Sequence, residues 1–273
     1  MKTSFSGHEK FECKASWLPL ASKDINAIFG DIETSISLTG IGSNKVKSLR
    51  QWMYKFSLLD DNKFTQEANT IFSYDPYLEK LDSLWILHTY LSQNIEKATL
   101  YFLFFNQFFV SSFTKESLLY KIQAWCENNN ISMSENTLES DVNVLIRMYL
   151  KNDTQNEFSN SIFNDLNILR KVEHEYIFNV KNPAALSDKA FLYLFLYSIR
   201  GYIGNTISVK DLQFGETSLQ YMLCLTEERL LDKLERLSTL TNNQIVYQEA
   251  AGIKQIYISS RPDIQAALID VYK

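Results

Sequence analysis

The chain has 273 residues, and its 27 Lys and Arg against 32 Asp and Glu give a formal net charge of −5. Hydrophobic residues make up 45% and charged residues 22%, a composition that excludes an intrinsically disordered protein and fits about two domains, or three small ones. The acidic balance argues against a nucleic-acid binder that is basic over its whole surface, but it permits one local basic patch.

Residues that interrupt helices are few, with 8 Gly and 4 Pro in the chain. Helical patterns alternate with short polar joints, which predicts a mainly α protein. We expect tandem winged-helix-like (helix-turn-helix) units around a central helical core, with small β-hairpin wings. The expected boundaries are an N-terminal winged-helix-like unit at residues 1–74, a central apolar helical pair at 75–112, a second unit at 113–182, and a third unit with a C-terminal hairpin at 183–273.

The first unit carries a helix-turn-helix pattern. A helix is expected from Asp31 to Leu38, followed by a sharp turn at Gly40-Ile41-Gly42. Ser43 then suits the N-cap of a helix over Asn44–Phe56. Residues 58–65 follow as a small hairpin, or wing.

The two faces of that second helix differ in chemistry. Its apolar residues recur at spacings of three and four, which defines a buried face: Val46, Leu49, Met53 and Phe56. The polar side chains outside this face include the amides of Asn44 and Gln51, which can pair with adenine. They also include Lys and Arg cations, which can reach guanine or phosphate. The predicted DNA-contacting residues are Asn44, Lys45, Lys47, Ser48, Arg50, Gln51 and Lys55 on the helix and Lys63 on the wing.

Basic charge is concentrated in this segment. From residue 41 to residue 64, five basic and two acidic residues leave a net charge of +3, in a chain whose total is −5. A solvated face with several Lys and Arg is also common on ordinary surface helices, so DNA contact and a plain solvent-exposed face both remain open.

A central pair of apolar helices is expected next. Asp75 followed by Pro76 predicts a helix start, and an apolar stripe that includes His88 follows. The next helix, Lys97–Val110, is apolar nearly all round and is expected to be buried. We expect this pair to hold the units together and His88 to be a hydrogen-bonded core residue; an aromatic ligand pocket there is the alternative.

The second unit has its own helix pair and hairpin. Thr114 is expected to cap a helix reaching Asn128, and Ser132 with Glu135 has the capping-box spacing ahead of a helix to Leu150. A polar insertion (151–161) and a strand pair within 168–180 follow. The second helix of this unit, which in a helix-turn-helix would face DNA, carries a net charge of −1 over residues 134–151. We therefore expect this unit to bind protein or to act as scaffold.

The third unit repeats that layout. We expect a helix from Asp188 to Gly201, Ser208 as a cap, a helix over Thr226–Leu240, and a hairpin that pairs residues 245–247 with 253–258. The second of these helices also has a net charge of −1. It is therefore expected to bind protein or a second copy rather than phosphates.

Catalytic signals are weak in this sequence. It contains no Walker loop, GxGxxG, GxSxG or HExxH motif, and Cys13, Cys126 and Cys224 are too far apart to suggest a metal site. His8 beside Glu9 leaves a base or metal ligand open, but packing of His8 against a neighbouring helix is favoured. We therefore expect no enzyme activity, no cofactor and no metal. Without an apolar leader or membrane-spanning segment, a cytoplasmic protein is expected.

Several motifs together resemble a bacterial family, domain of unknown function 4007. They are Phe5–Phe11 with Trp17-Leu18, Gly40–Trp52 with Leu58-Leu59, Leu84–His88, Phe105–Phe108 and Thr137–Val142. The resemblance implies genes beside phosphoadenosine-phosphosulfate-reductase-like genes in phage-defence and DNA sulfur-modification islands, and no assigned catalytic activity. Lys10 stands where the family has Thr or Ser, and Glu12 where Pro is common, which weakens an interpretation of the first motif as a strict active site.

The sequence and the resemblance together predict a DNA-binding component of a bacterial phage-defence or DNA-phosphorothioation system. The alternative is a non-catalytic protein–protein adaptor or a transcriptional regulator in such a system. The expected partners are double-stranded DNA, another protein of the same system and a second copy of the chain, with no membrane.

Overall fold

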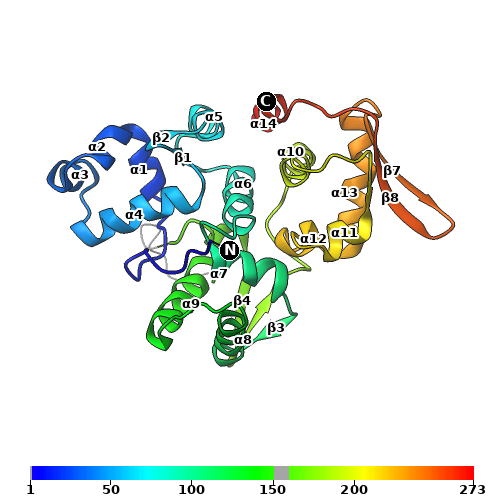
Figure 1. Cartoon of the computed structure of the whole chain (residues 1–273). Coiled ribbons are helices and arrows are strands. Elements are labelled where there is room, and N and C mark those ends of the chain that lie inside the picture. The colour runs from blue at the N-terminus through cyan, green and yellow to red at the C-terminus, as the bar shows by residue number, and fades with distance from the viewer. Residues whose placement is uncertain (1, 151–159) are drawn as a thin grey trace.

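The computed structural model describes residues 2–150 and 160–273 (Figure 1). Of the polar insertion predicted at 151–161, residues 151–159 lie outside the described residues. The protein is mainly helical, with small antiparallel sheets, as the sequence predicts. In the described ranges, no helix combines the length and the apolar character needed to cross a membrane.

The N-terminal region contains the predicted helix, turn, helix and hairpin. Its elements are α1 (Trp17–Lys23), α2 (Ile25–Phe29), α3 (Ile32–Thr39), α4 (Ser43–Lys55), β1 (Leu59–Asp60), β2 (Lys63–Phe64) and α5 (Gln66–Tyr74). Gly40 ends α3 with φ of +69°, a conformation that glycine adopts without steric cost, and its N–H donates to Ile36 O. The prediction that Ser43 caps α4 is wrong. Gly42 holds that position, and glycine has no side chain with which to accept from the first turn.

The central region consists of α6 (Leu81–Ser92), α7 (Thr99–Phe102) and a π-helical turn over Leu103–Gln107. The expected burial of both segments is confirmed, but the helix start predicted at Asp75-Pro76 is wrong. The Asp75 carboxylate instead accepts hydrogen bonds from the N–H groups of Glu79 and Lys80 and from the Ser83 hydroxyl. It therefore caps a loop that delays the helix until Leu81.

The middle region packs two helices beside a three-stranded sheet. Its elements are β3 (Ser112–Phe113), α8 (Lys115–Asn128), α9 (Glu135–Tyr149), a 3-10 turn (Asn164–Leu166), β4 (Leu169–Val172) and β5 (Glu175–Phe178). The strands are antiparallel in the order β3-β5-β4. Thr114 caps α8 as predicted. The cap of α9 is Ser134 rather than Ser132, because only Ser134 directly precedes the first helical residue and accepts from Thr137 N–H.

The C-terminal region also ends in a sheet. Its elements are α10 (Asp188–Ser198), β6 (Thr206–Ser208), α11 (Val209–Phe214), α12 (Leu219–Met222), α13 (Glu227–Leu240), β7 (Ile245–Ala250), β8 (Ile253–Ile258) and α14 (Ile264–Asp270). The strands are antiparallel in the order β6-β8-β7. The hairpin and the Ser208 cap are confirmed, whereas the first helix ends three residues before the predicted Gly201.

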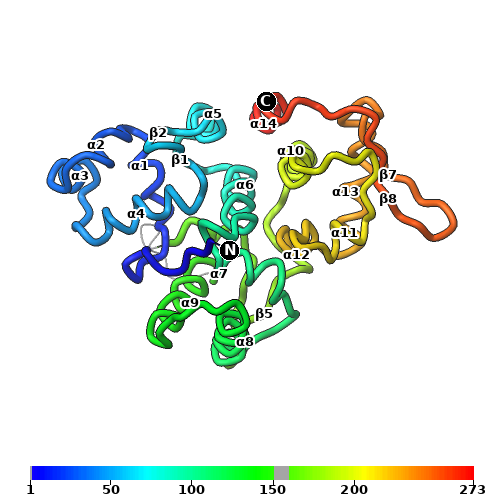
Figure 2. Tube along the Cα trace, viewed as in Figure 1, coloured from blue at the N-terminus to red at the C-terminus, as the bar shows by residue number. Residues whose placement is uncertain are grey.

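Segments from the two chain ends tie these regions together. The N-terminal arm, residues 2–16, runs between α4 and α9 before it enters α1 (Figure 2). At the other end, α14 packs on α10 and α5, and the Tyr272 ring stacks on Tyr74 with centroids 5.4 Å apart. Buried side chains from all regions form one hydrophobic core. The surface between α4 and α9 is thus built from segments far apart in the sequence.

Candidate nucleic-acid interface

The structure divides the predicted DNA-contacting residues into two groups. Those that are exposed are Asn44, Lys45, Lys47 and Gln51 on α4, and Lys63 on β2. Those that are wholly or partly buried are Ser48, Arg50 and Lys55. The helical spacing correctly identifies the apolar face of α4, since Val46, Leu49, Met53 and Phe56 are all fully buried. It does not reveal that a second face of the helix is covered.

Ser48 and Lys55 lie on that second face, and the prediction that they are exposed is wrong. Ser48 is 0% exposed, and its hydroxyl donates to the backbone carbonyl of His8 at 2.8 Å. Lys55 is 2% exposed, and its Nζ donates to Lys97 O at 3.1 Å and Ser4 Oγ at 3.3 Å. Burial lowers the pKa of Lys55 to about 8, against the opposing charge of Asp141. Both side chains therefore hold the N-terminal arm and its surroundings, not a ligand.

Arg50 is partly buried and bonds to the preceding helices. Its Nε donates to Ile28 O at 2.7 Å, and its Nη2 donates to Gly30 O at 2.9 Å and to Ser35 Oγ at 3.0 Å. The guanidinium also lies 5.8 Å from the centre of the Phe29 ring. Through Nε and Nη2, Arg50 ties the end of α2, Gly30 and α3 to α4.

The exposed part of α4 is still basic. No acidic residue occurs between Ser43 and Lys55, while Lys45 and Lys47 both face solvent. The first backbone N–H groups of α4 lack a side-chain cap, and the positive end of the helix dipole lies at the same place. Together these features make the first turn of α4 an electropositive surface. The wing is more mixed in charge, because Lys63 lies opposite Asp60 in the register of the hairpin.

The N-terminal arm reaches from α4 to α9. Ser6, Gly7, Glu9 and Lys10 all have φ between +48° and +83°, so the arm is sharply folded here. The Ser6 N–H donates to Asp141 Oδ2 at 2.7 Å, and His8 Nε2 lies 3.0 Å from Asp141 Oδ1. The prediction that His8 packs against a neighbouring helix is confirmed, because Asp141 belongs to α9.

Aromatic packing and a backbone contact hold the same arm on α4. The His8 ring stacks on Trp52, with centroids 5.7 Å apart and planes 9° apart. Trp52 Nε1 in turn donates to Phe11 O at 3.0 Å. The arm is therefore anchored by buried groups on two helices that are distant in the sequence.

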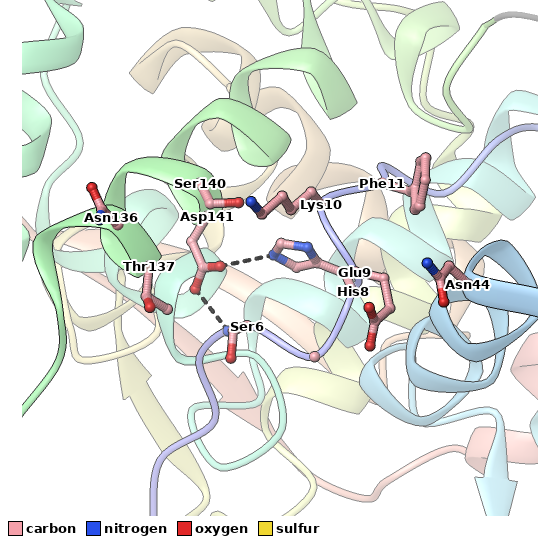
Figure 3. Close-up of a pocket in the computed structure, with 11 residues that line it drawn as sticks. Ser6, His8, Glu9, Lys10, Phe11, Asn44, Asn136, Thr137, Ser140 and Asp141 are labelled. Atoms are coloured by element: carbon pink, nitrogen blue, oxygen red, sulfur yellow. Dashed lines mark hydrogen bonds and ion pairs between the residues drawn. The ribbon is translucent and has the colours of Figure 1, made fainter.

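A polar pocket of about 600 Å³ opens where the arm meets the first turns of both helices (Figure 3). Its walls are residues 6–11 of the arm, Asn44 of α4, and Asn136, Thr137, Ser140 and Asp141 of α9. The sequence indicates Asn136 and Ser140 only as outward-facing residues of α9, and it gives no sign that they lie near His8. Covariation between the arm and α9 is the signal that would find this pairing.

Other nucleophilic or titratable side chains are enclosed in the core. Cys13, Cys126 and Cys224 are buried and unpaired, as expected, and burial raises the pKa of the Cys13 thiol. His88 is fully buried, with Nδ1 2.8 Å from Tyr149 Oη and Nε2 2.8 Å from Met222 O. Burial lowers the pKa of His88 to about 4, so it is a neutral core residue, as predicted.

The chain is similar to one known family and to solved structures. The family described as "Protein of unknown function (DUF4007)" matches residues 5–272. A "Magnesium ion-bound SspB crystal structure" has a TM-score of 0.81 and 22% identity, covering 98% of this chain and 85% of that one. An "SspB crystal structure" has a TM-score of 0.80 and 23% identity with the same coverage. No curated protein matches. At this level of identity, the SspB structures establish a shared fold.

Proposed function

Because the chain belongs to the family of proteins of unknown function DUF4007, we propose that it is the DNA-binding component of a bacterial phage-defence or DNA-phosphorothioation system. The family resemblance supports the biological setting, since it implies genes of DNA sulfur-modification islands. The electropositive first turn of α4 supports the contact with DNA. The second and third units, whose second helices each carry a net charge of −1, would remain for protein partners.

We propose that three segments have a winged-helix arrangement, with the boundaries expected from the sequence. In the first, α3 and α4 meet at the Gly40 turn and β1–β2 follows as the wing. In the second, α8 and α9 accompany the β3-β5-β4 sheet, and in the third, α13 leads into β7–β8. In the first segment, such a helix-turn-helix would place α4 in the major groove.

The observation that carries the proposal is the charge of the exposed face of α4. Lys45 and Lys47 would neutralise phosphates, and the free N–H groups of the first turn would donate to a phosphate oxygen. Asn44 and Gln51 supply amides that read adenine, and Lys63 would touch the backbone from the wing. Ser48 and Lys55, which are buried, have no part in this surface.

One of the similar SspB structures is magnesium ion-bound. Within the described ranges of this chain, no group of three or more His, Cys, Asp or Glu side chains is placed to hold a metal ion.

A mobility-shift assay on duplex DNA tests the proposal. The double variant Lys45→Glu, Lys47→Glu should abolish binding, because it replaces two cations by two anions on the exposed face of α4. A matched control is Lys189→Glu, Lys210→Glu, which changes the net charge equally at two exposed positions of the C-terminal region. Equal loss in both variants would indicate a nonspecific charge effect and contradict a DNA site on α4.

A second candidate function is that of an adaptor, favoured by apolar side chains exposed on the C-terminal region. Ile203 is 95% exposed, Ile253 65% and Phe214 63%. Large exposed apolar residues often mark protein contacts. Stable co-purification with a neighbouring gene product, combined with flat DNA titrations, would favour the adaptor over the DNA-binding protein.

A further inference from the structure

We propose that the pocket between the N-terminal arm and α9 binds a single nucleobase that carries an exocyclic amine. This inference deepens the proposed function, on which it rests for the source of the base: a nucleotide unstacked from the DNA that α4 contacts. The binding of the base itself depends only on the pocket.

The size and position of the pocket suit such a ligand. Its volume of about 600 Å³ lies within the range of small-molecule sites. Asn44 belongs both to the pocket wall and to the first turn of α4, and Lys45 follows it. DNA held on α4 would therefore run past the mouth of the pocket, where one nucleotide can turn inward.

Two buried atoms on the pocket wall lack a well-aligned hydrogen-bond partner among the described residues: His8 Nδ1 and Asp141 Oδ1. Oδ1 has one contact, with His8 Nε2 at 3.0 Å, and its second lone pair is open to a further donor. His8 is 4% exposed and Asp141 3%, so bulk water does not satisfy these atoms. Figure 3 shows the imidazole and the carboxylate facing one another between the arm and α9. Leaving buried polar atoms unpaired costs free energy, which a ligand with matching groups recovers.

The chemistry of these two atoms decides the kind of ligand. His8 Nε2 faces the Asp141 carboxylate at 3.0 Å, so in the neutral imidazole the ring proton lies on Nε2. Nδ1 is then an acceptor, and Asp141 Oδ1 is an acceptor as well. Two acceptors select a ligand that presents N–H donors. Adenine, cytosine and guanine each carry an exocyclic amine, whereas thymine has carbonyl oxygens on both sides of its single N–H.

A nucleobase fits the remaining wall better than a phosphate does. Asp141 and Glu9 contribute two carboxylates against the single ammonium group of Lys10, so the wall disfavours an anion. Asn136, Thr137 and Ser140 add an amide and hydroxyls that can bond the edge of a base. Phe11 supplies a half-buried ring against which a base can stack. The phosphate would instead lie outside, near Lys45, whose Nζ is 5.9 Å from the Phe11 ring centre.

Calorimetric titration of the full chain with free nucleosides tests the pocket directly, because nucleosides carry no phosphate for α4 to hold. Deoxyadenosine and deoxycytidine should bind at least about tenfold more tightly than thymidine, the discrimination expected for one well-placed polar pair. Equal affinity for all three, or no binding by any, would overturn the inference.

Variants on the exposed side of α9 locate the binding site without disturbing the buried pair. Asn136→Ala with Ser140→Ala should weaken deoxyadenosine binding severalfold. Asn143→Ala is the matched control, because Asn143 lies on the same helix outside this pocket. If the control weakens binding as much as the double variant does, the base lies elsewhere and the inference fails.

A duplex containing 2-aminopurine separates this inference from the proposed function. Unstacking should raise its fluorescence on binding to the wild-type chain but not to the Asn136→Ala, Ser140→Ala variant. Duplex binding without a fluorescence rise at any labelled position would reject DNA as the source of the base and leave the α4 interface standing. Nucleoside binding without duplex binding would reject the α4 interface and support the pocket.

Discussion

His8 in the N-terminal arm and Asp141 in α9 form a buried polar contact, with Nε2 3.0 Å from Oδ1. Because the His8 ring also stacks on Trp52 of α4, this one pair couples two helices from different regions of the chain. The arm thus has a structural task, and the polar pocket beside it is a consequence of how the arm is folded.

Asp141→Ala should lower the free energy of unfolding by about 3 kcal/mol, because it leaves His8 and the Ser6 N–H without their buried acceptor. Urea denaturation measures the change. The exposed Asp165→Ala is the control and should cost little. A loss below about 1 kcal/mol for Asp141→Ala would mean that the arm does not depend on this pair.

Lys55 should make stability depend on pH. Its pKa of about 8 in the folded chain lies below the ordinary 10.5, so the unfolded chain binds more protons between these values. The free energy of unfolding should therefore rise with pH, by about 2 kcal/mol from pH 7 to 9.5, relative to Lys55→Met. Denaturation of both proteins at the two pH values gives this difference. Lys47→Met, at an exposed position, should track the wild type, and a pH-independent gap for Lys55→Met would refute the assignment.

Variants of Arg50 and Lys47 should affect different properties: Arg50→Ala the stability of the fold, and Lys47→Ala the affinity for DNA. Arg50→Ala removes donors to Ile28 O, Gly30 O and Ser35 Oγ and should cost about 2 kcal/mol of unfolding free energy. Lys47→Ala should leave stability unchanged and weaken DNA binding. Thermal melts and duplex titrations on both variants check the pattern; the reverse pattern would place Arg50 at the DNA surface.

Tyr272 should hold the C-terminal helix on the rest of the protein. Its hydroxyl is 2.9 Å from Ser83 Oγ, its ring stacks on Tyr74, and Lys80 Nζ lies 5.3 Å from the ring centre. Tyr272→Ala should therefore increase hydrogen exchange throughout α14. Tyr77→Ala, at a side chain that is 63% exposed, is the control. Unchanged protection of α14 would show that its contacts with α10 suffice.

Local patterns predict the elements of this fold well. The helix α4, its buried face and the β7–β8 hairpin follow from apolar spacing and from turn residues within a few positions. The start of α6 is different, because Asp75 bonds forward to Ser83 and keeps the intervening residues out of the helix. Composition near Pro76 gives no sign of that contact.

The candidate site was only partly predictable for a related reason. A helical spacing identifies one buried face, and it assigns everything else to solvent. Ser48 and Lys55 are covered by the arm and the residues near it, and these lie far from α4 in the sequence. The contact between His8 and Asp141 depends on that same packing between segments distant in the sequence, so local sequence patterns cannot reveal it.

The salt dependence of duplex affinity tests the DNA-binding role of α4 most directly. Each phosphate contact contributes a slope of about 0.9 to the fall of log K with log salt concentration. Replacing Lys45 and Lys47 together by Gln should reduce the slope by about two, with the fold intact. An unchanged slope, or a wild-type chain whose binding does not respond to salt, would contradict the account.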